Sequence, residues 1–216
     1  MKSLEILQFI ENLEKGRVCV HPTDTIPGLA CDPRNPSAVR ALEEIKKRTE
    51  KKPFVGLVAS FEKAQVFWEE LDPLWKRVLA KVWPNTVSFL GRARKNLPSC
   101  LVSQTGELAL RVPRLRPEAE WFYEILQRMD VPLPSTSINW EGERPLLNRS
   151  EIESFARNHG VYLTSLAIEG SQQQASSLIR IEASGAYTFL REGAYSRQMF
   201  EDLFTLCKKE LAHDES

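Results

Sequence analysis

VCVHPTDTIPGLACD, residues 18–32, reads as a short buried strand that runs into a polar loop bounded by prolines. Valine alternates with cysteine or histidine over residues 18–21, which is typical of a strand. Pro22 ends this strand because proline has no backbone N–H to donate to a neighbouring strand. The loop then places the hydroxyls of Thr23 and Thr25 directly beyond the end of the strand.

Two interpretations of this loop are open on the residues alone. Small hydroxyl side chains that a strand holds in place can bind an anionic ligand. The same residues also fit a surface turn in which the Asp24 carboxylate caps its own backbone. Composition alone favours the surface turn, so the role of the loop depends on the other segments of the chain.

Composition predicts a soluble globular protein with one sizeable core. The chain has 216 residues, of which 42% are hydrophobic and 27% are charged. Lysine and arginine total 29, as do aspartate and glutamate, so no overall basic field favours binding to nucleic acid. A site for an anion must therefore be built from a local cluster of cations.

Cysteines, histidines and apolar runs predict a cytoplasmic protein with no metal site. No apolar run is long enough to span a membrane, and residues 1–16 lack the pattern of a signal peptide. The four cysteines form no CxxC pair, which argues against zinc and fits a reducing compartment. The three histidines have no spacing typical of metal ligands: they are His21, His159 and His213.

Helical and strand patterns alternate along the chain without a repeat or a linker. Helices are expected over residues 3–15, 35–48, 61–71, 73–82, 118–129, 150–158 and 196–212. Strands are expected over residues 18–21, 54–59, 86–91, 108–112, 162–168 and 188–193, with others beginning at 131 and near 176. The alternation predicts one α/β domain, residues 1–216, with a twisted mixed sheet, flanking helices and a cleft at one side. Its core covers about residues 3–195, and the helix 196–212 ends it.

A run of cations follows the helix at residues 35–48. Cations at a helix C-terminus complement its dipole, and such a run is usually a solvated face. This run leads directly into Pro53 and a buried strand, which brings it near the first loop. Its members are Lys46, Lys47, Arg48, Lys51 and Lys52.

Two later strands carry further candidate residues. Arg111 lies inside the apolar run ALRVP, so it either points to solvent at a strand edge or faces a cleft, where it can hold a carboxylate with two hydrogen bonds. Ser137 and Asn139 are two residues apart and lie on the same side of an extended chain. Asparagine can both donate and accept, although an Asx-type turn before Gly142 fits equally well.

Six segments, in order, resemble the YrdC/Sua5 family of threonylcarbamoyl-adenylate synthases over most of residues 15–195. PTDTIPGL resembles the family pattern PTDTVYGL, and IKKRT followed by KPF resembles IKGRP followed by a K/N-P-L segment. ALRVP, STSIN, SSLI and TFLREG resemble VAVRVP, TSAN, STVV and ILRPG. The resemblance implies a short, YrdC/RibB-like single domain with a concave cationic cavity.

The family's functional residues can be carried over to the matching positions. The resemblance assigns threonine and carbamate to Thr23, Thr25, Arg111, Ser176 and Ser177. It assigns ATP to Lys46, Arg48, Lys52, Ser137, Asn139 and Arg191, with Lys46 and Arg48 as the catalytic, phosphate-facing cations. The chain has no GxxxxGK[ST] loop, so separate cations must bind the phosphates, together with one Mg²⁺ that accompanies ATP. No side chain is expected to act as a nucleophile or general base.

The implied reaction converts L-threonine, bicarbonate and ATP to threonylcarbamoyl-AMP and pyrophosphate. The product would then serve t6A modification of adenosine 37 in tRNA, carried out by partner proteins of a t6A transferase complex. Contact with RNA or tRNA also stays open, whereas no membrane partner is expected.

The chain departs from the family pattern at several positions, and two alternatives therefore remain. One is a divergent paralogue that makes another carbamoyl-adenylate. The other is a non-enzymatic RNA-binding module, which the neutral overall charge argues against. The departures are Pro27, Lys47, Glu107, Trp140–Leu147 and Glu192.

Overall fold

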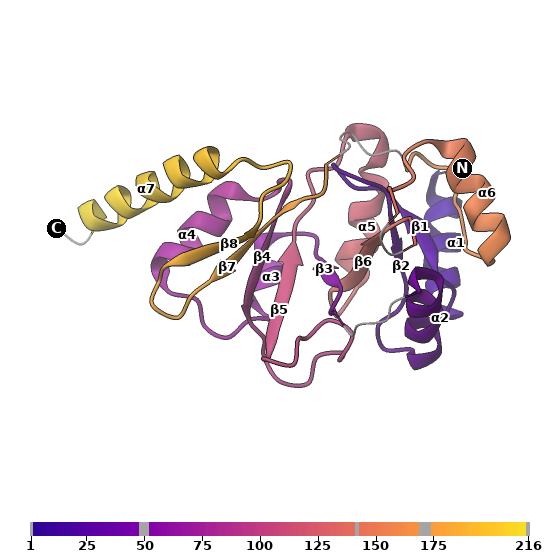
Figure 1. The fold of residues 1–216 in the computed structure, drawn as a ribbon, viewed down its shortest axis with the longest axis horizontal. Helices are drawn as coiled ribbons and strands as arrows, with labels where there is room; N and C mark the ends of the chain where they lie inside the picture. The colour runs from indigo at the N-terminus through magenta and orange to yellow at the C-terminus, as the bar shows by residue number, and fades with distance from the viewer. Residues whose placement is uncertain (1, 48–51, 141–142, 169–173, 215–216) are drawn as a thin grey trace.

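One eight-stranded sheet organises the computed structural model, which describes residues 2–47, 52–140, 143–168 and 174–214 (Figure 1). Its strand order is β1-β2-β6-β3-β5-β4-β7-β8. The pairs β3–β5 and β4–β7 are parallel, and the other five pairs are antiparallel. The predicted mixed sheet is thus confirmed. The strands are β1 (Cys19–His21), β2 (Gly28–Ala30), β3 (Val55–Leu57), β4 (Val87–Arg92), β5 (Glu107–Arg111), β6 (Leu133–Ser137), β7 (Ser177–Ile181) and β8 (Tyr187–Arg191).

Helices gather at both ends of the sheet. Figure 1 shows α4 and α7 beside β7 and β8, and α1, α2 and α6 at the β1 end. Trp75 of α4 packs against Phe200 and Phe204 of α7, with ring centroids 6.3 and 5.3 Å apart. The helices are α1 (Lys2–Glu14), α2 (Pro36–Lys46), α3 (Phe61–Gln65), α4 (Pro73–Val82), the 3₁₀ turn η1 (Pro117–Ala119), α5 (Trp121–Arg128), α6 (Arg149–His159) and α7 (Arg197–Asp214). None of these described helices is long and apolar enough to cross a membrane.

The central strand β5 divides its side chains between the core and an open cavity. Leu108 and Leu110 are fully buried in the core. Glu107, Ala109 and Arg111 alternate with them and line the cavity. Because side chains along a strand alternate between faces, the sheet presents one face to the core and the other to the cavity.

Helix starts marked by a polar residue and proline are confirmed. The Asn35 side chain accepts from the backbone N–H groups of Ser37 and Ala38 at 3.0 and 3.2 Å, with Pro36 in the first turn. Asp72 caps α4 in the same way ahead of Pro73. As a result, α4 covers the predicted range 73–82.

Two predicted elements need correction, and one strand was missed. Residues 162–168 form no strand beyond one bridge between Tyr162 and Cys19, because Arg149 donates to the carbonyls of Thr164 and Leu166 in place of a neighbouring strand. The helix expected over 61–71 ends at Gln65. The sequence reasoning also missed β2, which is only three residues long and starts with a glycine.

Candidate functional site

A cavity of about 550 Å³ opens on the free face of the sheet, and seven of the predicted site residues line it. They come from the loop after β1 and from segments at or beside β3, β5, β6, β7 and β8. Distant segments therefore meet in one cavity, as the resemblance implies, although the ligand roles of these residues stay predictions. The seven are Thr23, Thr25, Lys52, Arg111, Ser137, Ser176 and Arg191.

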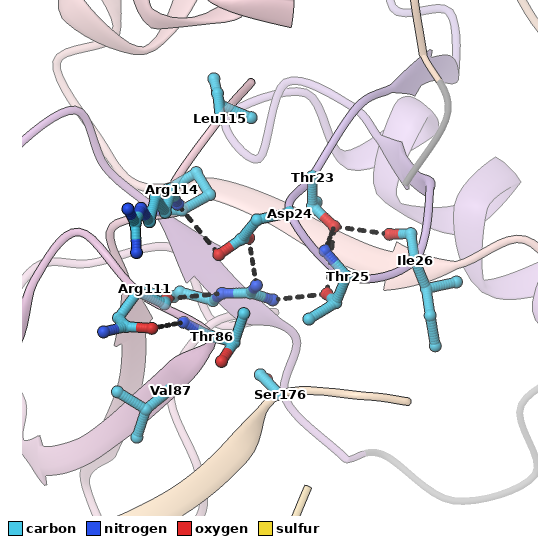
Figure 2. A network of polar contacts seen from close by, with 12 residues as sticks. Thr23, Asp24, Thr25, Ile26, Thr86, Val87, Arg111, Arg114, Leu115 and Ser176 are labelled. Carbon is cyan, nitrogen blue, oxygen red and sulfur yellow. Dashed lines mark hydrogen bonds and ion pairs between the residues drawn. The ribbon is translucent and has the colours of Figure 1, made fainter. Parts of the chain in front are cut away.

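The hydroxyls of the PTDT loop bond to each other and to the loop backbone. Thr23 donates to the carbonyl of Ile26 at 2.7 Å (Figure 2). Its Oγ1 also lies 3.1 Å from the backbone N and from the Oγ1 of Thr25. Because a hydroxyl carries one proton, Thr25 must be the donor in the hydroxyl pair. Both protons are thus used inside the loop, and both lone pairs of Thr23 Oγ1 are used on Thr25. Thr25 Oγ1 therefore keeps the one remaining acceptor lone pair of this hydroxyl pair.

Arg111 is buried and faces the loop, so its placement at a solvent-exposed strand edge is excluded. Its guanidinium forms an ion pair with Asp24, donates to Thr25 Oγ1 at 3.0 Å and donates to the carbonyl of Asn85 at 3.4 Å (Figure 2). Asp24 also accepts from the backbone N of Arg114 at 3.0 Å. Burial lowers the pKa of Arg111, and the Asp24 carboxylate opposes that shift. The pair anchors the PTDT loop to β5.

The other charged residues of the cavity come from β5, β7, β8 and the segment before β3. Arg191 of β8 donates to the carbonyl of Ser176 at 2.9 Å, and burial lowers its pKa. Arg180 of β7 forms an ion pair with Glu107, in which its Nε lies 2.9 Å from Oε1. The angle at this Nε–H does not meet the geometry of a hydrogen bond. Sequence reasoning missed Arg180, although its position two residues after Leu178 places both on one face of β7. Four of the five charged residues that line the cavity in the described chain are cations: Lys52, Arg111, Arg180 and Arg191.

Three predicted residues do not line the cavity. Ser177 donates to the Tyr195 carbonyl at 2.5 Å and accepts from the Gly193 N–H at 2.8 Å, which ties β7 to the segment after β8. Asn139 accepts from Ser137 and donates to the Glu143 carbonyl at 2.7 Å. Its amide is therefore hydrogen-bonded within the chain, whereas the Asx-type turn expected before Gly142 falls partly on residues 141–142, which lie outside the described residues.

Lys46 is the third of these residues and braces the end of β6. Its Nζ donates to the carbonyls of Ser137 and Asn139 at 2.8 and 2.6 Å and to Asn139 Oδ1 at 2.5 Å. The side chain is almost fully buried. It therefore holds the backbone of the site in place, whereas Arg48, the other predicted catalytic cation, lies outside the described residues.

Replacing Lys46 with methionine is expected to lower the free energy of unfolding by about 2 kcal/mol, because the lost ammonium leaves two carbonyls without this donor. Urea denaturation measures the change. Lys47→Met is the control, since Lys47 is exposed, and its effect should stay within about 1 kcal/mol. A Lys46→Met protein of unchanged stability that binds ATP poorly would instead support the phosphate role.

Two departures from the family pattern contact each other. Lys47 adopts a left-handed backbone conformation with φ 49° at the end of α2. Its ammonium lies 5.4 Å from the centroid of the Trp140 ring, a cation–π distance. A third departure, Glu192, accepts from the backbone N of Arg197 at the start of α7. Lys47, Trp140 and Glu192 thus have structural partners within this chain.

Comparison with known sequences decides the family. The sequence model of the Sua5/YciO/YrdC family, described as telomere recombination, matches residues 11–193. The chain belongs to this family. A protein named threonylcarbamoyl-AMP synthase from Coxiella burnetii is 35% identical over 140 residues, which cover 63% of this chain and 72% of that protein. One from Photobacterium profundum is 26% identical over 188 residues, or 86% and 97% of the two chains.

Solved structures confirm the fold of this Sua5/YciO/YrdC member. The P. abyssi Sua5 complexed with L-threonine superposes with a TM-score of 0.81 at 18% identity, over 94% of this chain. This chain spans 58% of that Sua5 chain's length. The E. coli YciO superposes with a TM-score of 0.77 at 21% identity, over 93% of this chain and 94% of YciO.

Proposed function

We propose that this protein is a threonylcarbamoyl-AMP synthase that uses L-threonine, bicarbonate and ATP. The observation that carries the proposal is the single cavity in which the PTDT loop, Arg111, Ser176 and Arg191 meet from distant segments. Relatives that bear this name match the chain over as much as 86% of its length.

The proposed chemistry is a nucleotidyl transfer. The threonine amine and bicarbonate form a carbamate and water, and a carbamate oxygen then attacks the α-phosphate of ATP. The bond between the α-phosphorus and its bridging oxygen breaks, and pyrophosphate leaves. Such a step needs charge neutralisation and alignment of the reacting atoms, which a cationic cavity supplies without a protein nucleophile. The carbamate is an unstable anion, so partial exclusion of water from the cavity protects it.

Different residues of the cavity fit different parts of the reactants. Lys52, Arg180 and Arg191 lie among the residues suited to the phosphates of ATP. The loop side, with Thr23 and Thr25, suits the amino acid. Mg²⁺ would enter with ATP, because it binds proteins mainly through substrate phosphates and water. The described residues contain no group of three His, Cys, Asp or Glu side chains that could hold a metal ion.

The product is proposed to pass to partner proteins that complete t6A in tRNA. The cytoplasm is the proposed location, in line with four cysteines that are all free thiols. Direct RNA contact and a different acceptor amine are outcomes that the following experiment separates.

Pyrophosphate release measures the proposed activity directly. Purified protein is incubated with ATP, Mg²⁺ and bicarbonate, and L-threonine is compared with L-serine, glycine and no amino acid. L-threonine is expected to stimulate release most strongly. Arg191→Gln should reduce the rate, while Lys209→Gln, an exposed residue of α7, serves as the matched control.

Other results would overturn the proposal. Release that is stimulated best by another amine would identify a paralogue with a different acceptor. A folded protein that releases no pyrophosphate but binds RNA in a salt-dependent manner would identify an RNA-binding module.

A further inference from the structure

His21, at the end of β1, is held in one orientation behind the cavity wall. The side chain is fully buried, and its ring stacks on Phe122 at a centroid distance of 4.9 Å and an interplanar angle of 7°. Its strand partner is Gly28, where a Cβ atom would lie 2.4 Å from His21 Nε2. Only glycine at this position leaves room for the ring.

The carbonyls of Pro22 and Leu29 both act on the ring, and the hydrogen bond to Pro22, the larger of the two effects, assigns the proton to Nδ1. His21 Nδ1 lies 3.0 Å from the carbonyl oxygen of Pro22, which can only accept. Nδ1 is therefore the N–H donor. Burial lowers the pKa of His21 to about 4, so the ring is neutral at pH 7 and Nε2 carries a lone pair.

The neutral His21 ring determines the direction of its hydrogen bond with Ser135. Ser135 Oγ lies 3.0 Å from His21 Nε2, and because Nε2 has no proton, the serine must donate. Ser135 also lines the cavity on β6. Because the Ser135 hydroxyl donates its only proton to His21, it can act toward a ligand only as a hydrogen-bond acceptor.

The neighbouring hydroxyls share this property. Thr23 donates its hydroxyl proton to the Ile26 carbonyl, and Thr25 donates its hydroxyl proton to Thr23 Oγ1. Carboxylate and phosphate oxygens need donors, and this part of the wall has no hydroxyl donor among these three side chains. An amine or carbamate N–H, in contrast, needs an acceptor, and the lone pairs of Ser135 Oγ can supply it. Thr25 Oγ1 keeps one lone pair beside Arg111, whereas Thr23 Oγ1 already accepts from the N and the Oγ1 of Thr25.

We propose that His21 is a positioning residue that makes Ser135 an obligate acceptor, and that this acceptor selects the amine of the amino-acid substrate. This inference rests on the proposed function, because it assigns one end of the same cavity to the N–H group that becomes the carbamate nitrogen. It requires no additional ligand and no proton transfer to His21.

Steady-state kinetics of single and double variants test the inference. His21→Phe keeps the stacking on Phe122 but removes both hydrogen bonds, and Ser135→Ala removes the acceptor directly. Each is expected to raise KM for L-threonine about tenfold, the size of one charge-assisted hydrogen bond, and to leave KM for ATP unchanged. If His21 acts through Ser135, the double variant shows no further rise. Unchanged threonine KM in Ser135→Ala, or a parallel rise in both KM values, would overturn the inference.

Binding and NMR separate this inference from the proposed function. Calorimetry compares L-threonine with 3-hydroxybutyrate, in which hydrogen replaces the amine and no donor is left at that position. The wild type should prefer the amine, and Ser135→Ala should lose that preference. The ¹⁵N resonances of His21 should show a protonated Nδ1. A protein that shows both but releases no pyrophosphate would contradict only the proposed function, whereas an Nε2–H ring, no amine preference or no binding of L-threonine would contradict the inference.

Discussion

Replacing Asp24 with alanine is expected to lower the free energy of unfolding by about 3–5 kcal/mol. Asp24 and Arg111 form an ion pair with side chains only 5% and 6% exposed. The substitution leaves the guanidinium buried without its counter-charge, and the backbone N of Arg114 also loses its acceptor. Arg111 itself keeps its contacts to Thr25 and to the Asn85 carbonyl, which do not compensate for the lost charge.

A double variant distinguishes a missing charge partner from a general disruption of the loop. Asp24→Leu combined with Arg111→Met replaces the ion pair by apolar side chains of similar size, which often restores stability. Urea denaturation should therefore rank the double variant well above Asp24→Ala. The double variant should still fail to release pyrophosphate, because the PTDT loop loses its anchor to β5. Equal stability of Asp24→Ala and the wild type would show that the pair is not a structural element.

Which segments build the site could be predicted from sequence, because each segment carries its own local pattern. ALRVP and TFLREG were each predicted as strands and the PTDT loop at the end of a strand, and the sheet brings them together around one cavity. Local rules were sufficient where a cap or a proline fixes a boundary, as at Asp72–Pro73. They failed for residues 162–168, whose apolar pattern is that of a strand but whose carbonyls are bound by Arg149.

The direction of hydrogen bonds inside the site was not predictable. The hydroxyl of Thr23 was expected to donate to a ligand, but it donates to the Ile26 carbonyl three residues away. Lys46 was expected to face phosphate, but it reaches carbonyls more than 90 residues further along the chain. Arg180 was missed because Glu107, its ionic partner, lies on β5, and only the order β5-β4-β7 brings the two together. These contacts depend on tertiary pairing, which a local motif does not contain.

His21 is expected to make the protein sensitive to mild acid. Burial, the largest cause, lowers its pKa from 6.5 to about 4, and the charge of Arg111 adds to this. The carbonyls of Pro22 and Leu29 oppose the shift. Between pH 6.5 and about 4 the unfolded chain therefore binds a proton that the folded chain does not, so the free energy of unfolding falls as the pH falls.

The full difference in pKa, from 6.5 to about 4, corresponds to about 3 kcal/mol, of which about 2 kcal/mol should be lost between pH 7 and pH 5. Urea denaturation at both pH values measures this loss in the wild type. His21→Phe is less stable at pH 7, because the Pro22 carbonyl loses its donor, but its stability should change much less over the same interval. Acidic groups with lowered pKa values, such as Asp32 and Glu5, lose their contribution only at lower pH. An equal loss in the wild type and in His21→Phe would show that folding does not lower the pKa of His21, so that the ring binds its proton over the same pH range as in the unfolded chain.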